Sequence, residues 1–81
     1  QVFPNPSSGI FNFTFQAEDG ESLAVKVYDI NGKLVKQYRP VANGFIQKQV
    51  VDIQEPVFAS GMYLLEAIAG ERKQTFRLVK Q

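Results

Sequence analysis

The sequence predicts an all-β domain, an antiparallel sandwich or barrel, from three observations. Apolar and polar residues alternate with period two along most of the 81-residue chain, the pattern of half-buried strands. Turn residues separate the alternating segments at intervals of about 8–12 residues, the spacing typical of sandwich and barrel strands. A hydrophobic content of 44% and an aromatic content of 12% are enough for one compact core and argue against disorder.

The chain opens with QVFPNPSSGIFNFTF, in which Pro4 and Pro6 precede an alternating aromatic segment. Proline fixes φ near −65°, lacks an N–H, and pushes the residue before it into extended conformations. We therefore expect residues 3–6 to be extended but unable to form a full hydrogen-bonded ladder, and residues 7–9 to form a turn. The segment is expected to act as a rigid cap, with Phe3 filling the edge of the sandwich.

Six alternating segments follow this opening. In the first of them Phe11, Phe13 and Phe15 share one face, so these aromatic side chains are expected to form much of the core. The predicted strands cover residues 10–16, 23–27, 34–38, 45–53, 62–69 and 73–79.

The segment VKVYDINGKLV contains a hairpin turn that has two interpretations. Asn31 followed by Gly32 is typical of a two-residue type I′ hairpin. That register would place the apolar Val27 opposite the charged Lys36.

We prefer a type I turn that begins at Asp29 and ends at Gly32, with Gly32 in the left-handed conformation of a G1 bulge. This register brings apolar residues together across the two strands. Replacing Gly32 by Ala is then expected to cost about 1 kcal/mol or more, because φ is positive there. The preferred cross-strand pairs are Val27 with Val35 and Tyr28 with Leu34.

The charges are uneven although their sum is only +1. Acidic residues crowd the first turn at residues 18–21, whereas the last ten residues contain four bases and no acid. Phe76 and Leu78 are expected to point into the core, which leaves the intervening side chains on the other face. A basic strand at a sheet edge is protected from self-association, and the same edge can also accept a partner by strand addition. The outward residues of this last strand are Lys73, Thr75, Arg77, Val79 and Gln81.

Much catalytic chemistry is excluded by composition. The chain contains no histidine and no cysteine, which removes imidazole and thiol catalysis and ordinary zinc sites. The loop that starts at Asp29 lacks the ligand spacing of an EF-hand calcium site. The small net charge gives no reason to expect a nucleic-acid partner, and no apolar run approaches the ~18 residues of a membrane span. The residues alone thus predict an all-β module that is not an enzyme and needs no cofactor or metal.

Five short segments, in this order, resemble one known family. They are FPNPSSGIFNF, VKVYDINGKLV, VDI, ASGMYLLEA and KQTFRLVKQ. Together they resemble the C-terminal sorting domains of the type IX secretion system of Bacteroidota, and the resemblance extends from Phe3 to Lys80.

The resemblance implies an immunoglobulin-like sandwich of about seven strands. Residues 1–81 would then be a single C-terminal sorting domain, preceded by a cargo domain in a larger exported polypeptide. Such cargo passes through the periplasm and reaches the cell surface or the medium. The resemblance further implies that the outer-membrane translocon would recognise the domain and that a sortase-like cysteine protease would remove it. The alternative is an immunoglobulin-like module of an extracellular protein that binds carbohydrate or mediates adhesion.

The resemblance also singles out candidate residues. We expect the glycines among them to be needed for the conformation of the backbone rather than for contacts. We expect Tyr63 to be an inward-pointing aromatic residue beside Leu65. Residues 73–81 are expected to carry much of the sorting signal. The candidates are Pro4, Asn5, Pro6, Gly9, Asp29, Gly32, Gly61, Tyr63, Lys73, Arg77 and Lys80.

Overall fold

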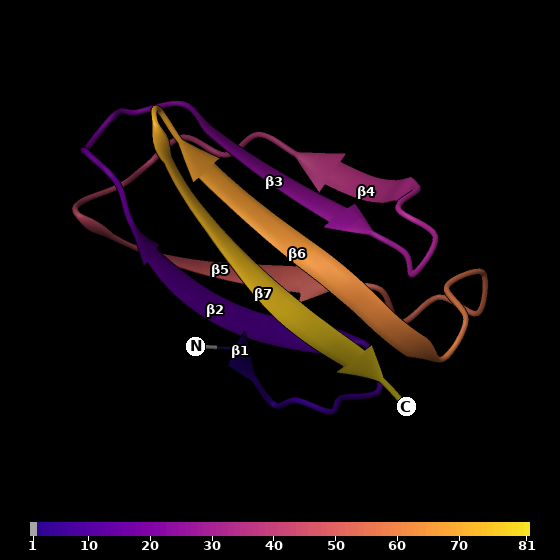
Figure 1. Ribbon diagram of the computed structural model, residues 1–81. Helices are drawn as coiled ribbons and strands as arrows, with labels where there is room; N and C mark the ends of the chain where they lie inside the picture. The colour runs from indigo at the N-terminus through magenta and orange to yellow at the C-terminus, as the bar shows by residue number, and fades with distance from the viewer. Residues whose placement is uncertain (1) are drawn as a thin grey trace.

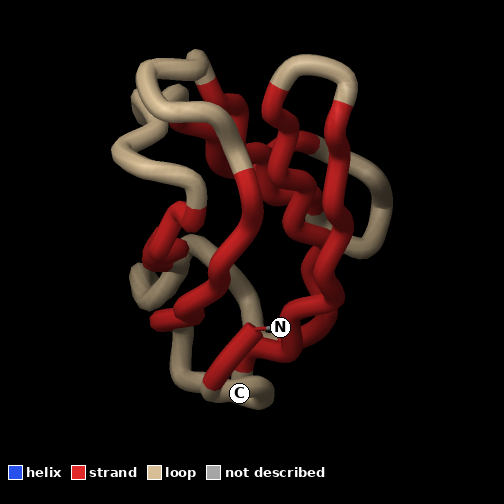
Figure 2. Tube along the Cα trace, turned by 90° about the vertical axis from the view of Figure 1, so that its left-hand side faces the viewer, coloured by secondary structure: helices blue, strands red, loops and turns tan. Residues whose placement is uncertain are grey.

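The computed structural model describes residues 2–81, which form seven strands in two antiparallel sheets (Figure 1). The strands are β1 (Val2–Phe3), β2 (Ile10–Gln16), β3 (Leu23–Tyr28), β4 (Leu34–Tyr38), β5 (Ile46–Asp52), β6 (Gly61–Ala69) and β7 (Arg72–Lys80). One sheet has the order β1-β2-β5 and the other β4-β3-β6-β7. The strands are joined by turns and loops alone (Figure 2). The expected immunoglobulin-like sandwich is confirmed. Across residues 2–81, no helix is long and apolar enough to span a membrane.

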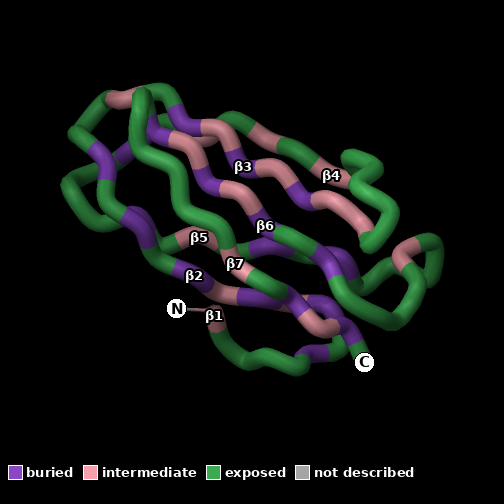
Figure 3. Tube along the Cα trace, viewed as in Figure 1, coloured by how far each residue is buried: buried purple, intermediate pink, exposed green. Residues whose placement is uncertain are grey.

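The core lies between the two sheets, and the period-two pattern places it there. Buried and more exposed residues alternate along β2, β3 and β6 (Figure 3), because successive strand side chains point to opposite faces. Phe11, Phe13 and Phe15 are all buried, as predicted. Leu78 is fully buried, and the ring of Phe76 lies 5.6 Å from that of Phe13 in the opposite sheet. The inward face predicted for the last strand is therefore confirmed.

Phe3 does not fill the edge of the sandwich, so that expectation is wrong. The two residues of β1 pair with β2, Val2 with Phe13 and Phe3 with Asn12. Neighbouring strand residues face opposite sides of a sheet. Val2 is the residue that packs against the core, while Phe3 is 56% exposed.

The turn between β3 and β4 has the predicted conformation. The Gly32 N–H donates to the Asp29 carbonyl at 3.0 Å, and the Asp29 N–H donates to the Lys33 carbonyl at 2.9 Å. Gly32 has φ of 82°. The carboxylate of Asp29 accepts the N–H groups of Asn31 and Lys33, both at 2.9 Å. Asp29 thus stabilises the turn from its first position.

One of the two predicted cross-strand pairs is wrong. Tyr28 pairs with Leu34 as expected. The register of the two strands then shifts between Tyr28 and Val27, so that Val27 pairs with Lys36 rather than with Val35. The shift lets Val35 pack against the core. It also directs the Lys36 ammonium to the carbonyl of Asp52 in the other sheet. Contacts between the sheets therefore override the register that the hairpin alone would favour.

Side chains from β4 join the two sheets along one side of the sandwich. The Tyr38 hydroxyl donates to the Val50 carbonyl of β5 at 2.7 Å, near the bond from Lys36 to Asp52. Burial raises the pKa of Tyr38 to about 12. These bonds occupy carbonyls at the outer edge of β5, which would otherwise be open to pairing.

The raised pKa of Tyr38 makes stability fall at alkaline pH. A phenol that holds its proton more tightly in the folded protein stabilises the fold fully below about pH 10, and this contribution is lost as the pH rises toward about 12. Tyr38→Phe should flatten the decline in the free energy of unfolding over that window, as measured by urea denaturation at a series of pH values. An equally steep decline in the variant would contradict the assignment.

Candidate recognition site

The candidate residues gather at one end of the sandwich, apart from Lys73. At this end β3, β5 and β7 finish and β6 begins, beside the turn that precedes β2 (Figure 1). Lys73 lies at the start of β7, at the opposite end. The residues that lie at the common end, or in the N-terminal segment and strands that lead to it, are Pro4, Asn5, Pro6, Gly9, Asp29, Gly32, Gly61, Tyr63, Arg77 and Lys80.

The N-terminal segment passes from one sheet to the other. We call residues 2–7 the arm. Its first two residues pair with β2 in one sheet, and Ser7 forms a parallel bridge with Lys80 in the other. Pro4 and Pro6 lie in the crossing, and the peptide bonds that precede them are both cis. The crossing belongs to neither sheet, so its residues need no N–H groups for ladder hydrogen bonds. Proline, which has no N–H, is therefore tolerated there.

Asn5 takes the place of a strand beside β7. Its side-chain Nδ2 donates to the Arg77 carbonyl at 2.7 Å, and its Oδ1 accepts the Val79 N–H at 2.9 Å. The next residues complete the pairing, since the Ser7 N–H donates to the Val79 carbonyl at 3.0 Å and the Gln81 N–H donates to the Ser7 carbonyl at 2.8 Å. The arm therefore covers the C-terminal half of the β7 edge.

Gly9 is held against the end of β5. Its φ is 138°, and a Cβ there would lie 2.6 Å from the Cα of Gln54 and 2.9 Å from the carbonyl carbon of Ile53. The Ser7 hydroxyl accepts the N–H groups of Gly9 and Ile10, each at 3.1 Å. These contacts make Gly9 a backbone requirement of the fold.

Lys80 is buried, with 7% of its surface exposed. Its Nζ donates to the carbonyl oxygens of Phe58 at 2.5 Å, Glu55 at 3.1 Å and Gln54 at 3.4 Å. We call this arrangement the C-terminal clamp, because it fastens the β5–β6 loop to the last residues of β7. Because side chains alternate along a strand, residue 80 lies on the same face as the buried Leu78. This alternation is the feature of the sequence that indicates an inward-pointing ammonium.

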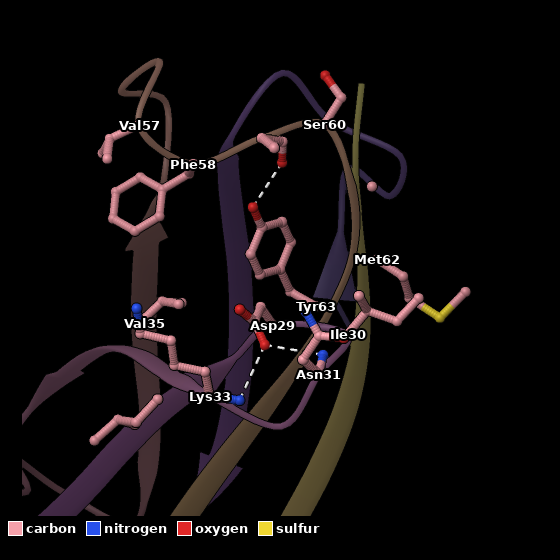
Figure 4. Close-up of a pocket in the computed structure, with 13 residues that line it drawn as sticks. Asp29, Ile30, Asn31, Lys33, Val35, Val57, Phe58, Ser60, Met62 and Tyr63 are labelled. Carbon is pink, nitrogen blue, oxygen red and sulfur yellow. Dashed lines mark hydrogen bonds between the residues drawn. The ribbon is translucent and has the colours of Figure 1, made fainter.

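Tyr63 sits in a tyrosine corner, a feature of immunoglobulin-like sandwiches. The side chain is 7% exposed, and its hydroxyl donates to the carbonyl of Ala59, four residues earlier, at 2.6 Å (Figure 4). Burial, and to a lesser degree the charge of Asp29, raises the pKa of this phenol. Gly61, with φ of 141°, lies in the short segment between Ala59 and Tyr63 that this hydrogen bond closes. The inward placement expected for Tyr63 is confirmed.

A hollow of about 650 Å³ opens between the β3–β4 turn and the β5–β6 loop (Figure 4). Its rim is apolar and accessible, with Ile30 78% and Val57 81% exposed. A second hollow of about 540 Å³ lies alongside, and Met62 lines both. The Asp29 carboxylate in the wall of the first hollow accepts N–H groups of the turn, and the exposed rim offers apolar contact surface. Within residues 2–81, no cluster of three acidic, histidine or cysteine side chains has the arrangement of a metal site.

The outward bases of β7 have different surroundings. Lys73 Nζ lies 3.5 Å from a carboxylate oxygen of Glu66 on β6. Arg77 is exposed and lines the second hollow, with no ion pair to any residue of the range 2–81. Arg77 therefore presents an accessible cation beside apolar surface at the common end.

Comparisons with known proteins identify one family. The family model described as the secretion system C-terminal sorting domain matches residues 1–81. Searches of curated proteins and of solved structures gave no match. The family match therefore stands beside the fold as the guide to function.

Proposed function

This chain belongs to the family of secretion system C-terminal sorting domains, and from that premise we propose how it acts as a type IX sorting signal. The outer-membrane translocon recognises the folded domain in the periplasm. A sortase-like cysteine protease then removes the domain and leaves the cargo attached to the cell surface or released. The observation that carries the proposal is the family match over the whole chain.

Two features of the fold support this proposal. The arm and the end of β7 are hydrogen-bonded to each other, so a cargo joined ahead of the arm would be tethered beside the last strand. The side chains of Lys73 and Arg77 on that strand are exposed, in a position to meet a receptor. We therefore assign recognition to the outward side chains of β7.

The alternative, a carbohydrate-binding or adhesive module, has less support. Carbohydrate sites of that type use several exposed aromatic rings on one face. Here Phe11, Phe13 and Phe15 are buried in the core, and Phe3 and Phe45 are the phenylalanines with large exposure.

The test is export of a reporter. Residues 1–81 are fused to the C-terminus of a reporter that carries an inner-membrane signal peptide, in a bacterium with a type IX system. We expect the reporter at the cell surface or in the medium, and a mass that shows loss of the domain. In a strain without the translocon, the uncleaved fusion should remain in the periplasm. Periplasmic retention in the competent strain as well would overturn the proposal.

The contribution of β7 is tested by substitution, because deleting residues 73–81 would remove the buried Leu78 and the pairing with β6. The double variant Lys73→Gln, Arg77→Gln should retain the fold and reduce export. The matched control is Lys48→Gln, which removes an exposed strand lysine from the other sheet. Equal export of the double variant and the control would exclude recognition through these two bases.

A further inference from the structure

One side of the sandwich is only half closed. On this side the edge of β2 in one sheet lies beside the edge of β7 in the other (Figure 1). The arm covers part of each edge, through β1 on β2 and through Asn5 and Ser7 on β7. The remainder of both edges has no strand beside it among residues 2–81.

The exposed part of β7 presents unpaired backbone groups. Both backbone groups of Val79 and the carbonyl of Arg77 are bound by the arm. In an antiparallel ladder, alternate residues direct both their N–H and C=O toward the same neighbour. The backbone groups of Lys73 and Thr75, and the N–H of Arg77, therefore point to the same side, and no residue in the range 2–81 bonds to them.

The edge of β2 is open opposite this stretch. The Gly9 carbonyl and the Ala17 N–H both bond to the chain on the β5 side, so the even-numbered residues between them face away from β5. Asn12 is paired with β1. The backbone groups of Thr14 and Gln16 have no such partner among residues 2–81. Within residues 2–81 no strand covers residues 14–16 and 72–76, and we call these two stretches the open seam.

A hollow of about 210 Å³ separates the two edges of the open seam. Its walls combine apolar groups from the core with polar side chains from the edges. The lining residues are Phe15, Gln16, Ala67, Arg72, Lys73 and Gln74. The seam thus offers backbone hydrogen bonds and a shallow apolar recess along the same line.

We propose that the open seam binds an extended peptide segment as an added strand beside β7, and that acidic side chains alternate with small apolar ones in that segment. Strand addition supplies main-chain hydrogen bonds, while alternate side chains give specificity. The partner is a segment of the export machinery, an assignment that rests on the proposed function. The binding site itself rests on the geometry of the seam.

The side chains of β7 define the chemistry of the added strand. On the outer face its side chains would lie beside Lys73, Thr75 and Arg77, where opposite charges across strands are stabilising and like charges are not. Arg77 has no ion pair with residues 2–81, and Lys73 has a single long one, at 3.5 Å. On the inner face the side chains would meet Phe76 and the recess, which has room for small apolar groups.

The test uses a capped hexapeptide of alternating glutamate and valine, titrated to millimolar concentration into the isotope-labelled domain. We expect saturable amide NMR shifts at Lys73, Thr75 and Arg77, whose N–H groups face the seam. The same peptide with lysine in place of glutamate should bind at least tenfold more weakly. No saturable shift at these amides, or equal binding of the two peptides, would overturn the proposal.

Thr75→Pro removes one seam-facing N–H without taking a donor from the β6–β7 ladder. It should lower the affinity for the glutamate peptide at least tenfold, whereas the control Thr75→Val should not. A charge-reversed variant, Lys73→Glu with Arg77→Glu, gives an independent reading: its preference should switch to the lysine peptide. Unchanged binding by Thr75→Pro, or an unchanged preference after charge reversal, would contradict strand addition.

The export assay separates this inference from the proposed function. If Thr75→Pro loses the peptide but its fusion is exported normally, the seam does not bind the machinery, and the sorting function stands. If the unmodified domain fails to direct export but binds the glutamate peptide, the proposed function fails and the binding site stands. Loss of both peptide binding and export in Thr75→Pro, but not in Thr75→Val, supports both the binding of the export machinery by the seam and the proposed sorting function.

Discussion

Gly9→Ala is expected to lower the free energy of unfolding by about 3 kcal/mol or more, among the largest effects of any single methyl in this domain. A positive φ costs a residue with a side chain about 1–2 kcal/mol, and overpacking costs about 1–3 kcal/mol. Here the new Cβ would lie 2.6 Å from the Cα of Gln54, a backbone atom that no rotamer change can remove. A domain of this size has a total stability of roughly 4–12 kcal/mol, so much of the margin would be lost. Urea denaturation measures the change.

Gly32→Ala is the matched control for the steric part of this effect. Gly32 also has a positive φ, 82°, but nothing lies within 4 Å of the position its Cβ would take. The cost there should be only about 1–2 kcal/mol, from conformation alone. If the two variants are equally stable, the close approach to Gln54 is not a constraint on the fold.

Lys80→Met is expected to cost about 2–4 kcal/mol, because hydrogen bonds to a charged group are each worth more than neutral ones. Methionine keeps most of the apolar stem but leaves the three carbonyls of the C-terminal clamp without their donor. The β5–β6 loop should then loosen. Amide hydrogen exchange faster at residues 54–58 than elsewhere would report this, alongside urea denaturation.

Lys48→Met provides the control, since Lys48 is exposed on β5 and its loss should change stability by no more than about 0.5 kcal/mol. Comparable stability of the two variants would mean that the clamp contributes nothing to the fold. The comparison also matters for export: a defect in Lys80→Met fusions that tracks unfolding reflects lost structure rather than a lost contact with the translocon.

Local patterns predicted most of the fold. The alternation around Phe13 and Leu65 identified inward faces that the structure confirms, because in strands the side-chain period alone decides the face. The turn at Gly32 followed from local chemistry as well, since an Asx residue and a glycine at the right spacing favour it. The ends of the six predicted strands differ from the observed ones by at most one residue.

What the sequence could not show depends on contacts between distant segments. The irregularity at Val35 accompanies contacts of β4 with the other parts of the sandwich: Val35 packs against the core, and Lys36 reaches a carbonyl in the other sheet. The role of Asn5 requires knowing that β7 passes beside it, 72 residues later in the chain. For Lys80, the period-two pattern indicates the inward face, but the acceptors of its ammonium come from a loop more than twenty residues away. In each case a polar side chain forms its hydrogen bonds with backbone groups of a distant segment, and only the tertiary fold brings that segment close.

The C-terminal clamp makes the full stability of this domain depend on residues 80 and 81. Lys80 holds the β5–β6 loop, and Gln81 bonds to the arm, so two neighbouring residues fasten two segments that lie far apart in the sequence. Chains are made from the N-terminus onward, and a product that ends before Lys80 lacks both contacts. The domain therefore reaches its full stability only after β7 and the residue that follows it have been synthesised.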